Sequence, residues 1–204
     1  MPRALLVDYG GVLTTSVLGS FAAFCRDETL ETQLVRDVFV AAARTPDNVF
    51  ARVEVGALTA AQFDVELASL LSAAAGRAIA SDGLKARLFA RAERDEAMCA
   101  AVAAMRAQGV RTVLLSNSWG GDDYPLEELE PLFDELVISG HVGLRKPDAA
   151  IYELGAQRAG VPATECVFVD DFKVNIDAAE ALGMTGVHHL DTPSTVARLN
   201  ELFA

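Results

Sequence analysis

Short apolar runs that end abruptly at a polar residue recur along this chain of 204 residues. Each run is continuous rather than alternating, which is typical of strands buried on both faces of a parallel sheet. Four runs are clear and a fifth is weaker; in chain order they are 4–7, 113–115, 136–138, 167–169 and the weaker 186–190. We therefore expect these segments to be the strands of one sheet.

Helical patterns fill the intervals between the later runs. A glycine just beyond the last helical residue is a common stop signal, and it follows three of the helical segments, 97–108, 148–159 and 174–182. Thr192 and Pro193 predict one more helix, with threonine as the N-cap and proline at the first helical position. This alternation of strand and helix predicts a doubly wound α/β fold with a parallel sheet.

Residues 16–94 have a different pattern. They contain no convincing strand, and helices are expected around 17–25, 31–43, 60–71 and 81–91. An insert of about 80 residues is too long for a loop and is enough for a small helical bundle. We predict an α/β core formed by residues 1–15 and 95–204, with an all-helical domain, residues 16–94, inserted after the first strand.

Composition and charge narrow the class of protein. Hydrophobic residues make up 51% of the chain and charged residues 23%, which indicates a folded globular protein. The net charge of -12 and the lack of a Lys/Arg cluster argue against a nucleic acid partner. The three cysteines are far apart in the sequence, so we expect buried free thiols rather than disulfides or a zinc site.

The location of the protein is also predicted from the apolar segments. The first apolar run is broken by Asp8 and is too short for a signal peptide, and no stretch is long enough to span a membrane. We therefore expect a cytoplasmic protein without a membrane partner. A monomer and a homodimer are both compatible with the sequence.

Polar residues follow the predicted strands at the points where the strands end. They are Asp8, Ser116-Asn117, Ser139 and Asp170-Asp171. Right-handed crossovers bring the carboxyl ends of parallel strands to one edge of the sheet, where ligands bind. Asp170-Asp171 could be a simple turn into the next helix, but two adjacent carboxylates repel each other unless a cation is present. The sequence therefore favours a metal site at this edge.

Four motifs occur in order: LLVDYGGVL, VLLSNS, GLRKPDAAIY and VFVDDFKVNIDAAEALGM. With the helical insert just after the first motif, this set resembles the haloacid dehalogenase-like hydrolases, and most of all the phosphatase branch similar to the N-terminal domain of soluble epoxide hydrolase. The resemblance covers the whole chain. It implies a Rossmann-like core, a small all-helical cap and a small phosphorylated metabolite as substrate.

The resemblance also implies a role for each motif. Asp8 would attack phosphorus and form an aspartyl phosphate, and Lys146 would neutralise charge on the nucleophile and on the transferring group. Ser116, the amide of Asn117 and Lys146 would bind the phosphate. Asp8, the backbone carbonyl of Gly10 and Asp171 would bind Mg2+, with Asp170 as an outer or alternate ligand. Asn175 would orient the loop that carries the paired aspartates.

One position departs from the family pattern. Most phosphatases of this family carry a second aspartate two residues after the nucleophile, where it serves as general acid and base. This chain has Gly10 there. Because such help is worth roughly 100- to 10,000-fold in rate, we predict a slow enzyme or a substrate with a good leaving group.

Three other functions remain open at this stage. A metal-independent 2-haloacid dehalogenase shares the aspartate nucleophile, but the paired aspartates and Gly10, where such enzymes usually carry tyrosine, disfavour it. A phosphomutase would depend on the missing acid–base aspartate. A binding or regulatory module with little turnover is kept open by the loss of that aspartate.

Overall fold

The computed structural model describes residues 1–45, 47–120 and 124–204. Within these residues five strands form one parallel sheet in the order β3-β2-β1-β4-β5, as the apolar runs predict. The strands are β1 (Ala4–Val7), β2 (Arg111–Ser116), β3 (Glu135–Ile138), β4 (Cys166–Asp170) and β5 (Thr185–His188). The strand order reverses direction at β1, which therefore lies at the centre of the sheet with β2 and β4 on either side.

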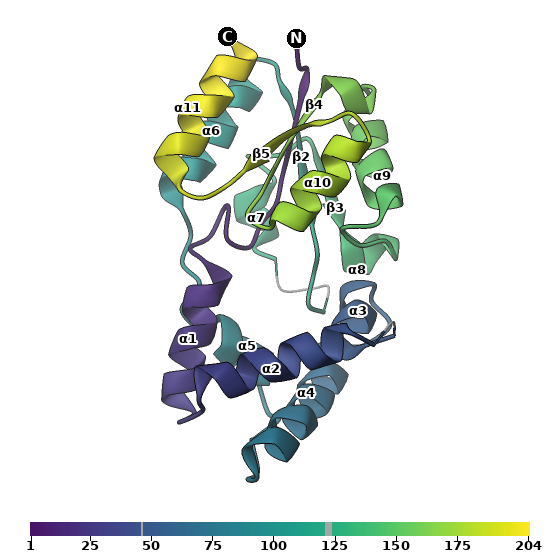
Figure 1. The fold of residues 1–204 in the computed structure, drawn as a ribbon. Coiled ribbons are helices and arrows are strands. Elements are labelled where there is room, and N and C mark those ends of the chain that lie inside the picture. The colour runs from purple at the N-terminus through teal and green to yellow at the C-terminus, as the bar shows by residue number, and fades with distance from the viewer. Residues whose placement is uncertain (46, 121–123) are drawn as a thin grey trace.

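Helices cover both faces of the sheet, which explains why its strands are apolar throughout (Figure 1). Leu5 and Val7 of β1 point into one cluster, which also contains residues of α6 (Glu96–Ala107) and α11 (Thr192–Phe203). Ala4 and Leu6 point the opposite way, into a second cluster beneath α9 (Ala149–Ala159) and α10 (Lys173–Ala181). All four β1 residues are fully buried, so a polar residue can follow only where the strand leaves the sheet.

The last helix begins one residue earlier than the sequence predicts. Asp191, not Thr192, is the N-cap of α11, and its carboxylate accepts a hydrogen bond from Ser194 N at 2.9 Å. The Thr192 hydroxyl is already used, because it donates to the Asp95 carboxylate at 2.5 Å. Asp95 in turn caps α6 by accepting from Met98 N, so the starts of the two helices are joined.

The inserted residues form a helical cap over the carboxyl ends of the strands (Figure 1). Its five helices are α1 (Val17–Asp27), α2 (Thr32–Ala43), α3 (Val49–Glu54), α4 (Ala60–Ala75) and α5 (Leu84–Phe89). They surround a hydrophobic cluster of their own, separate from the two clusters of the sheet. The helix α3 was not predicted, because six residues are too few to give a helical periodicity, and α5 is shorter than the predicted 81–91.

Two adjacent segments connect the cap to the core. Thr14 and Arg94 form an isolated antiparallel bridge, and Thr15 N donates to Glu93 O at 2.7 Å. On the core side, Asp95 N donates to Leu13 O at 2.9 Å. This pairing lies where the sequence places the domain boundaries, 15/16 and 94/95, which we keep as a proposal.

Three short elements lie between the strands of the core. They are α7 (Leu126–Leu129), α8 (Ser139–Val142) and the 3-10 helix η1 (Ala163–Glu165). All three cysteines are buried and free, as expected. No helix in the described part of the chain is both long enough and apolar enough to cross a membrane.

Candidate active site

Asp8 lies at the centre of the carboxyl edge of the sheet, next to the end of β4. Its backbone N–H continues the ladder by donating to Val169 O at 3.0 Å, which sets Asp8 beside Asp170. Lys146 lies between the two carboxylates, with Nζ 2.8 Å from Asp8 Oδ1 and 2.7 Å from Asp170 Oδ2. Each of the three residues is at least nine-tenths buried. The ends of two strands and a distant loop therefore meet in one desolvated group of charges.

Asn117 fixes the loop that carries Lys146. Its side chain donates to Lys146 O at 3.0 Å and accepts from Lys146 N at 2.8 Å. The Asn117 amide group is thereby held in one orientation at the end of β2. The side chain of Asn117 thus positions the lysine, while the predicted phosphate contact belongs to its backbone N–H.

The two adjacent aspartates have different surroundings. Asp170 accepts from Asn175 Nδ2 at 3.0 Å on both oxygens, from Phe172 N at 2.8 Å and from Lys146. Tyr152 holds Asn175 in turn, because its hydroxyl donates to Asn175 O at 3.0 Å. With its oxygens occupied in this way, Asp170 is better suited to an outer role than to direct contact with a metal. The predicted orienting role of Asn175 agrees with these contacts.

One carboxylate oxygen of Asp171 is left without a hydrogen bond by the residues that the structure describes. This atom, Oδ1, is buried, a costly arrangement unless a cation or ligand is bound. Gly11 makes room for this carboxylate, since its φ is +78° and a Cβ there would lie 2.4 Å from Asp171 Oδ2. His188 holds the backbone, because its Nε2 lies 3.0 Å from Asp171 O and donates to it.

The carboxylates of Asp8, Asp170 and Asp171 offer oxygens within 4.8 Å of one another. Three negative charges and the one positive charge of Lys146 leave two negative charges in the group. Burial raises the pKa of Asp8 to about 7, with a further rise from Asp170 and Asp171 that Lys146 opposes. Burial and Asp170 also raise the pKa of Asp171 to about 6. A divalent cation would remove this repulsion, so the residues present fit a metal ion.

Lys146 keeps its charge in this environment. Burial by itself would lower the pKa of the ammonium group, but Asp8 and Asp170 outweigh burial and raise it. The lysine is therefore a fixed positive charge that contacts the candidate nucleophile.

Ser116 has a partner that the sequence did not reveal. Its Oγ lies 2.9 Å from the hydroxyl of Tyr124. The Tyr124 ring packs against that of Tyr9, the neighbour of Asp8, with centroids 5.1 Å apart and planes tilted by 56°. Burial raises the pKa of Tyr124, so the phenol stays protonated and able to donate. No sequence signal marks Tyr124 as part of the site.

The cap occupies the space beside Gly10, where most family phosphatases carry the acid–base aspartate. A Cβ at Gly10 would lie 3.2 Å from Val17 Cγ2, at the start of α1. The site therefore lacks the carboxyl group, and a side chain at position 10 would require Val17 to shift by a few tenths of an ångström.

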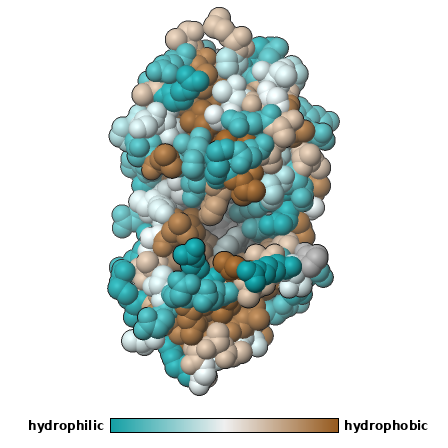
Figure 2. Space-filling model, viewed as in Figure 1, coloured by the Kyte–Doolittle hydropathy of each residue, from teal (hydrophilic) through white to brown (hydrophobic). Residues whose placement is uncertain are grey.

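Trp119 links the end of β2 to the cap. Its ring lies 5.1–6.2 Å, centroid to centroid, from five phenylalanine rings of the cap, Phe21, Phe39, Phe50, Phe63 and Phe89. The molecule is hollowed at the junction of core and cap, with apolar residues on both sides of the hollow (Figure 2). An aromatic cluster thus begins two residues after Asn117.

Ser139, the remaining strand-end residue, does not join the carboxylates. Its Oγ accepts from Ser118 N at 2.8 Å and donates to Glu54 O of the cap at 2.5 Å. Glu54 was not predicted from the sequence, because its contacts with Ser139 and Arg145 depend on how the cap is docked on the core. The Glu54 carboxylate pairs with Arg145, with Oε2 2.5 Å from Nε.

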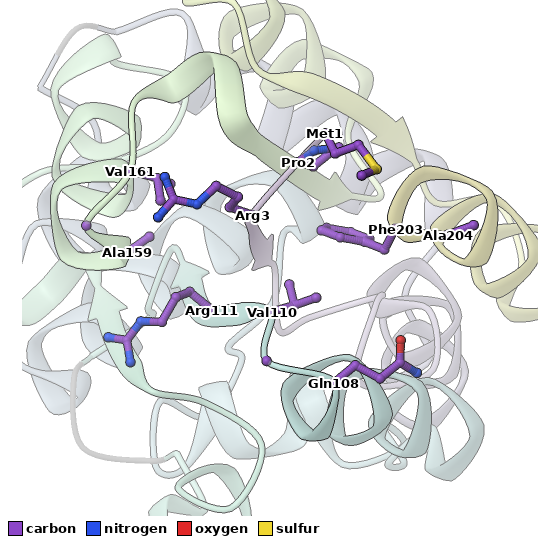
Figure 3. Close-up of a pocket in the computed structure, with 12 residues that line it drawn as sticks. Met1, Pro2, Arg3, Gln108, Val110, Arg111, Ala159, Val161, Phe203 and Ala204 are labelled. Atoms are coloured by element: carbon purple, nitrogen blue, oxygen red, sulfur yellow. The ribbon is translucent and has the colours of Figure 1, made fainter.

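A separate cavity of about 620 Å³ lies at the opposite edge of the sheet, near both chain ends (Figure 3). Its two arginines are already paired, Arg3 with Glu165 and Arg111 with Asp134. None of the predicted site residues lines it. The candidate catalytic and metal-binding residues therefore lie at the carboxyl edge of the sheet and not at this cavity.

Comparisons with known proteins found relatives of this chain. The chain is 34% identical over 111 residues to the sesquiterpene phosphatase AstK of Aspergillus oryzae, covering 53% of this chain and 57% of that protein. It is 27% identical over 216 residues to the bifunctional epoxide hydrolase 2 of Rattus norvegicus, covering 98% of this chain and 38% of the relative. The chain thus spans well under two thirds of both relatives.

A solved structure shares the whole fold. The enzyme BT-2542 of Bacteroides thetaiotaomicron, crystallised with magnesium and inorganic phosphate, aligns with a TM-score of 0.64 at 20% identity, over 92% of this chain and 94% of that one. The family model for haloacid dehalogenase-like hydrolases matches residues 2–183. With this match over nearly its whole length, the chain belongs to the haloacid dehalogenase-like hydrolases.

Proposed function

We propose that this hydrolase is a Mg2+-dependent phosphatase that removes phosphate from a small, largely apolar metabolite through an aspartyl phosphate on Asp8. The observation that carries the proposal is the buried group at the sheet edge. Asp8 contacts Lys146 at 2.8 Å and lies in one carboxylate cluster with Asp171, whose Oδ1 has no hydrogen-bond partner among the described residues. The name of the Aspergillus relative supports phosphoryl transfer over dehalogenation.

Each residue of the group has a part in this reaction. Asp8 attacks phosphorus as the leaving oxygen departs on the opposite side, and water later cleaves the acyl phosphate. Lys146 supplies a fixed positive charge beside the attacking oxygen. Ser116 Oγ and the N–H of Asn117 donate to oxygens of the phosphoryl group. Mg2+, held by Asp8, Asp171 and the carbonyl of Gly10, would supply the remaining neutralisation of charge.

The aromatic cluster supports an apolar leaving group. Trp119 and the partly exposed Phe21, Phe39 and Phe89 lie at the cap side of the phosphate residues. Aromatic surface favours hydrocarbon over sugar hydroxyls, which would lose hydrogen bonds to water there. The isoprenoid substrate class in the name of the Aspergillus relative agrees with this preference.

A substrate panel tests the proposal. Purified protein is assayed for phosphate release from prenyl, aryl and sugar monophosphates, each with Mg2+ and with EDTA, beside the Asp8→Asn variant. We expect Mg2+-dependent release that is fastest for prenyl phosphates and absent in Asp8→Asn. Halide release from 2-haloacids without metal would instead identify a dehalogenase. Binding of the phosphates without any turnover would identify a binding module.

A further inference from the structure

Glu54, the last residue of α3, is a charged residue of the cap that is buried against the core. Its residue exposure is 8%, and its Oε2 lies 2.5 Å from Nε of Arg145. The Arg145 side chain is 30% exposed, so this pair lies at the rim of the domain junction. Arg145 immediately precedes Lys146, and the ion pair therefore joins the cap to the loop of the candidate catalytic lysine.

The backbone of Glu54 makes a second connection. Glu54 O accepts from Ser139 Oγ, which in turn accepts from Ser118 N. Ser118 directly follows Asn117, the predicted phosphate ligand. One end of α3 is thus hydrogen-bonded, directly or through one residue, to both loops that would hold the phosphoryl group.

The turn after α3 is shaped for close contact with the core. Gly56 has φ +76°, and a Cβ there would lie 2.5 Å from Gly140 O of α8. Gly120 shows the same closeness, because a Cβ there would lie 3.1 Å from Ala60 Cβ of α4. Only glycine permits both approaches, so the docked position of the cap is built into the backbone on both sides of the junction.

The charges around Glu54 indicate what the contact does. Burial raises the pKa of Glu54, while Arg145, Lys146 and a hydrogen bond from Asn117 favour the ionised form. All three of these core residues belong to the strand-end loops. In the docked cap these three residues partly offset the cost of burying the carboxylate, so the ionised form of Glu54 depends on contacts with the core.

We propose that Glu54 is a positioning residue that couples docking of the cap to the arrangement of Asn117 and Lys146. The inference rests on the proposed function, because those two residues matter only if a phosphoryl group is bound there. When the cap docks, Glu54 draws Arg145 and Ser139 together, and the lysine loop and the end of β2 are fixed in one step. The enzyme then becomes fully competent only with the substrate enclosed.

Trp119 provides a readout that does not depend on catalysis. It is the one tryptophan of the chain, and its ring contacts phenylalanines of the cap. The experiment compares acrylamide quenching of Trp119 fluorescence in the wild type, in Glu54→Gln and in Glu66→Gln. Glu66 is a matched control, since it pairs with Arg52 within the cap at a half-exposed position. We expect the quenching constant to rise about twofold in Glu54→Gln and to stay unchanged in the control.

Kinetics of the same variants test the coupling to the site. We expect kcat/KM to fall on the order of tenfold in Glu54→Gln and in Arg145→Gln, and the double variant to be no worse than either, because one buried ion pair is lost in each case. Wild-type quenching in Glu54→Gln, or losses that add in the double variant, would overturn the inference. If the wild type releases no phosphate, the proposed function alone is refuted. The fluorescence quenching would still decide whether Glu54 holds the cap on the core.

Discussion

Replacing Lys146 by methionine tests the electrostatic balance at the sheet edge. Methionine keeps much of the volume of the lysine stem but removes the ammonium group that contacts Asp8 and Asp170. Three carboxylates would then share a site with oxygens within 4.8 Å of one another and no countercharge in contact with them. Removing one partner of a buried ion pair costs about 3–5 kcal/mol of folding free energy. For a chain of this size that loss corresponds to a fall in Tm of roughly 6–20 °C.

The loss of folding free energy in Lys146→Met should be larger at high pH than at low pH. Without the lysine, burial and the other two carboxylates raise the pKa of Asp8 further above its unfolded value. A carboxyl group of this kind holds its proton in the folded state at pH values where the unfolded chain has lost it. It therefore favours folding at low pH, and this contribution disappears as pH rises through the folded pKa. The difference in the free energy of unfolding between Lys146→Met and the wild type should be large at pH 8 and smaller at pH 5.5.

The assay is urea unfolding at both pH values, with and without Mg2+. Lys173→Met is the control, since Lys173 is exposed and its ion pair in the described part of the chain is with Asp177, one helical turn away. We expect the control to unfold like the wild type, and Mg2+ to recover part of the loss in Lys146→Met. If Lys146→Met were as stable as the control at pH 8 in EDTA, the lysine would not be balancing buried charge, and the account of the site would be wrong.

Three further predictions concern the same edge of the sheet. Mg2+ affinity should rise as pH increases from 5.5 to 8, because the carboxyls of Asp8 and Asp171, with pKa values of about 7 and about 6, must lose protons to bind the ion; calorimetry that shows a flat profile would contradict this. Gly10→Asp should speed turnover of unactivated substrates more when Val17→Ala makes room for it, so equal rates in the single and double variants would refute the steric argument. Tyr124→Phe should lower kcat/KM by about tenfold with little change in Tm, and an unchanged value would show that its hydroxyl does not serve the site.

The sequence was sufficient for the parts of the site that strands carry. Asp8 and Asp170 could be predicted because each follows a continuous buried run, and parallel strands of this topology place such residues at one edge. The motif around Lys146 placed that residue near them through the family resemblance. These features depend on local pattern and on general rules of sheet topology, both of which can be read along a chain.

The features that could not be predicted depend on contacts between different segments of the chain. Glu54 lies 91 residues before Arg145, and its position is set by how the cap sits on the core, which no periodicity encodes. Tyr124 contacts Ser116 across eight residues of sequence, and no local periodicity marks that contact. The N-cap of α11 was misplaced by one residue because Thr192 has the right chemistry, yet its hydroxyl serves a different helix.

The two chain ends lie together, away from the active site. Met1 and Ala204 line the same cavity at the far edge of the sheet, so a short linker could join them without crossing a strand. Opening the joined chain between residues 94 and 95 would give a circular permutant in which the helical bundle hangs from a single connection instead of two. The permutant would keep every side chain of the enzyme and change only the mobility of the helical bundle relative to the core. Comparing its activity with that of the original chain would therefore measure what the second connection contributes.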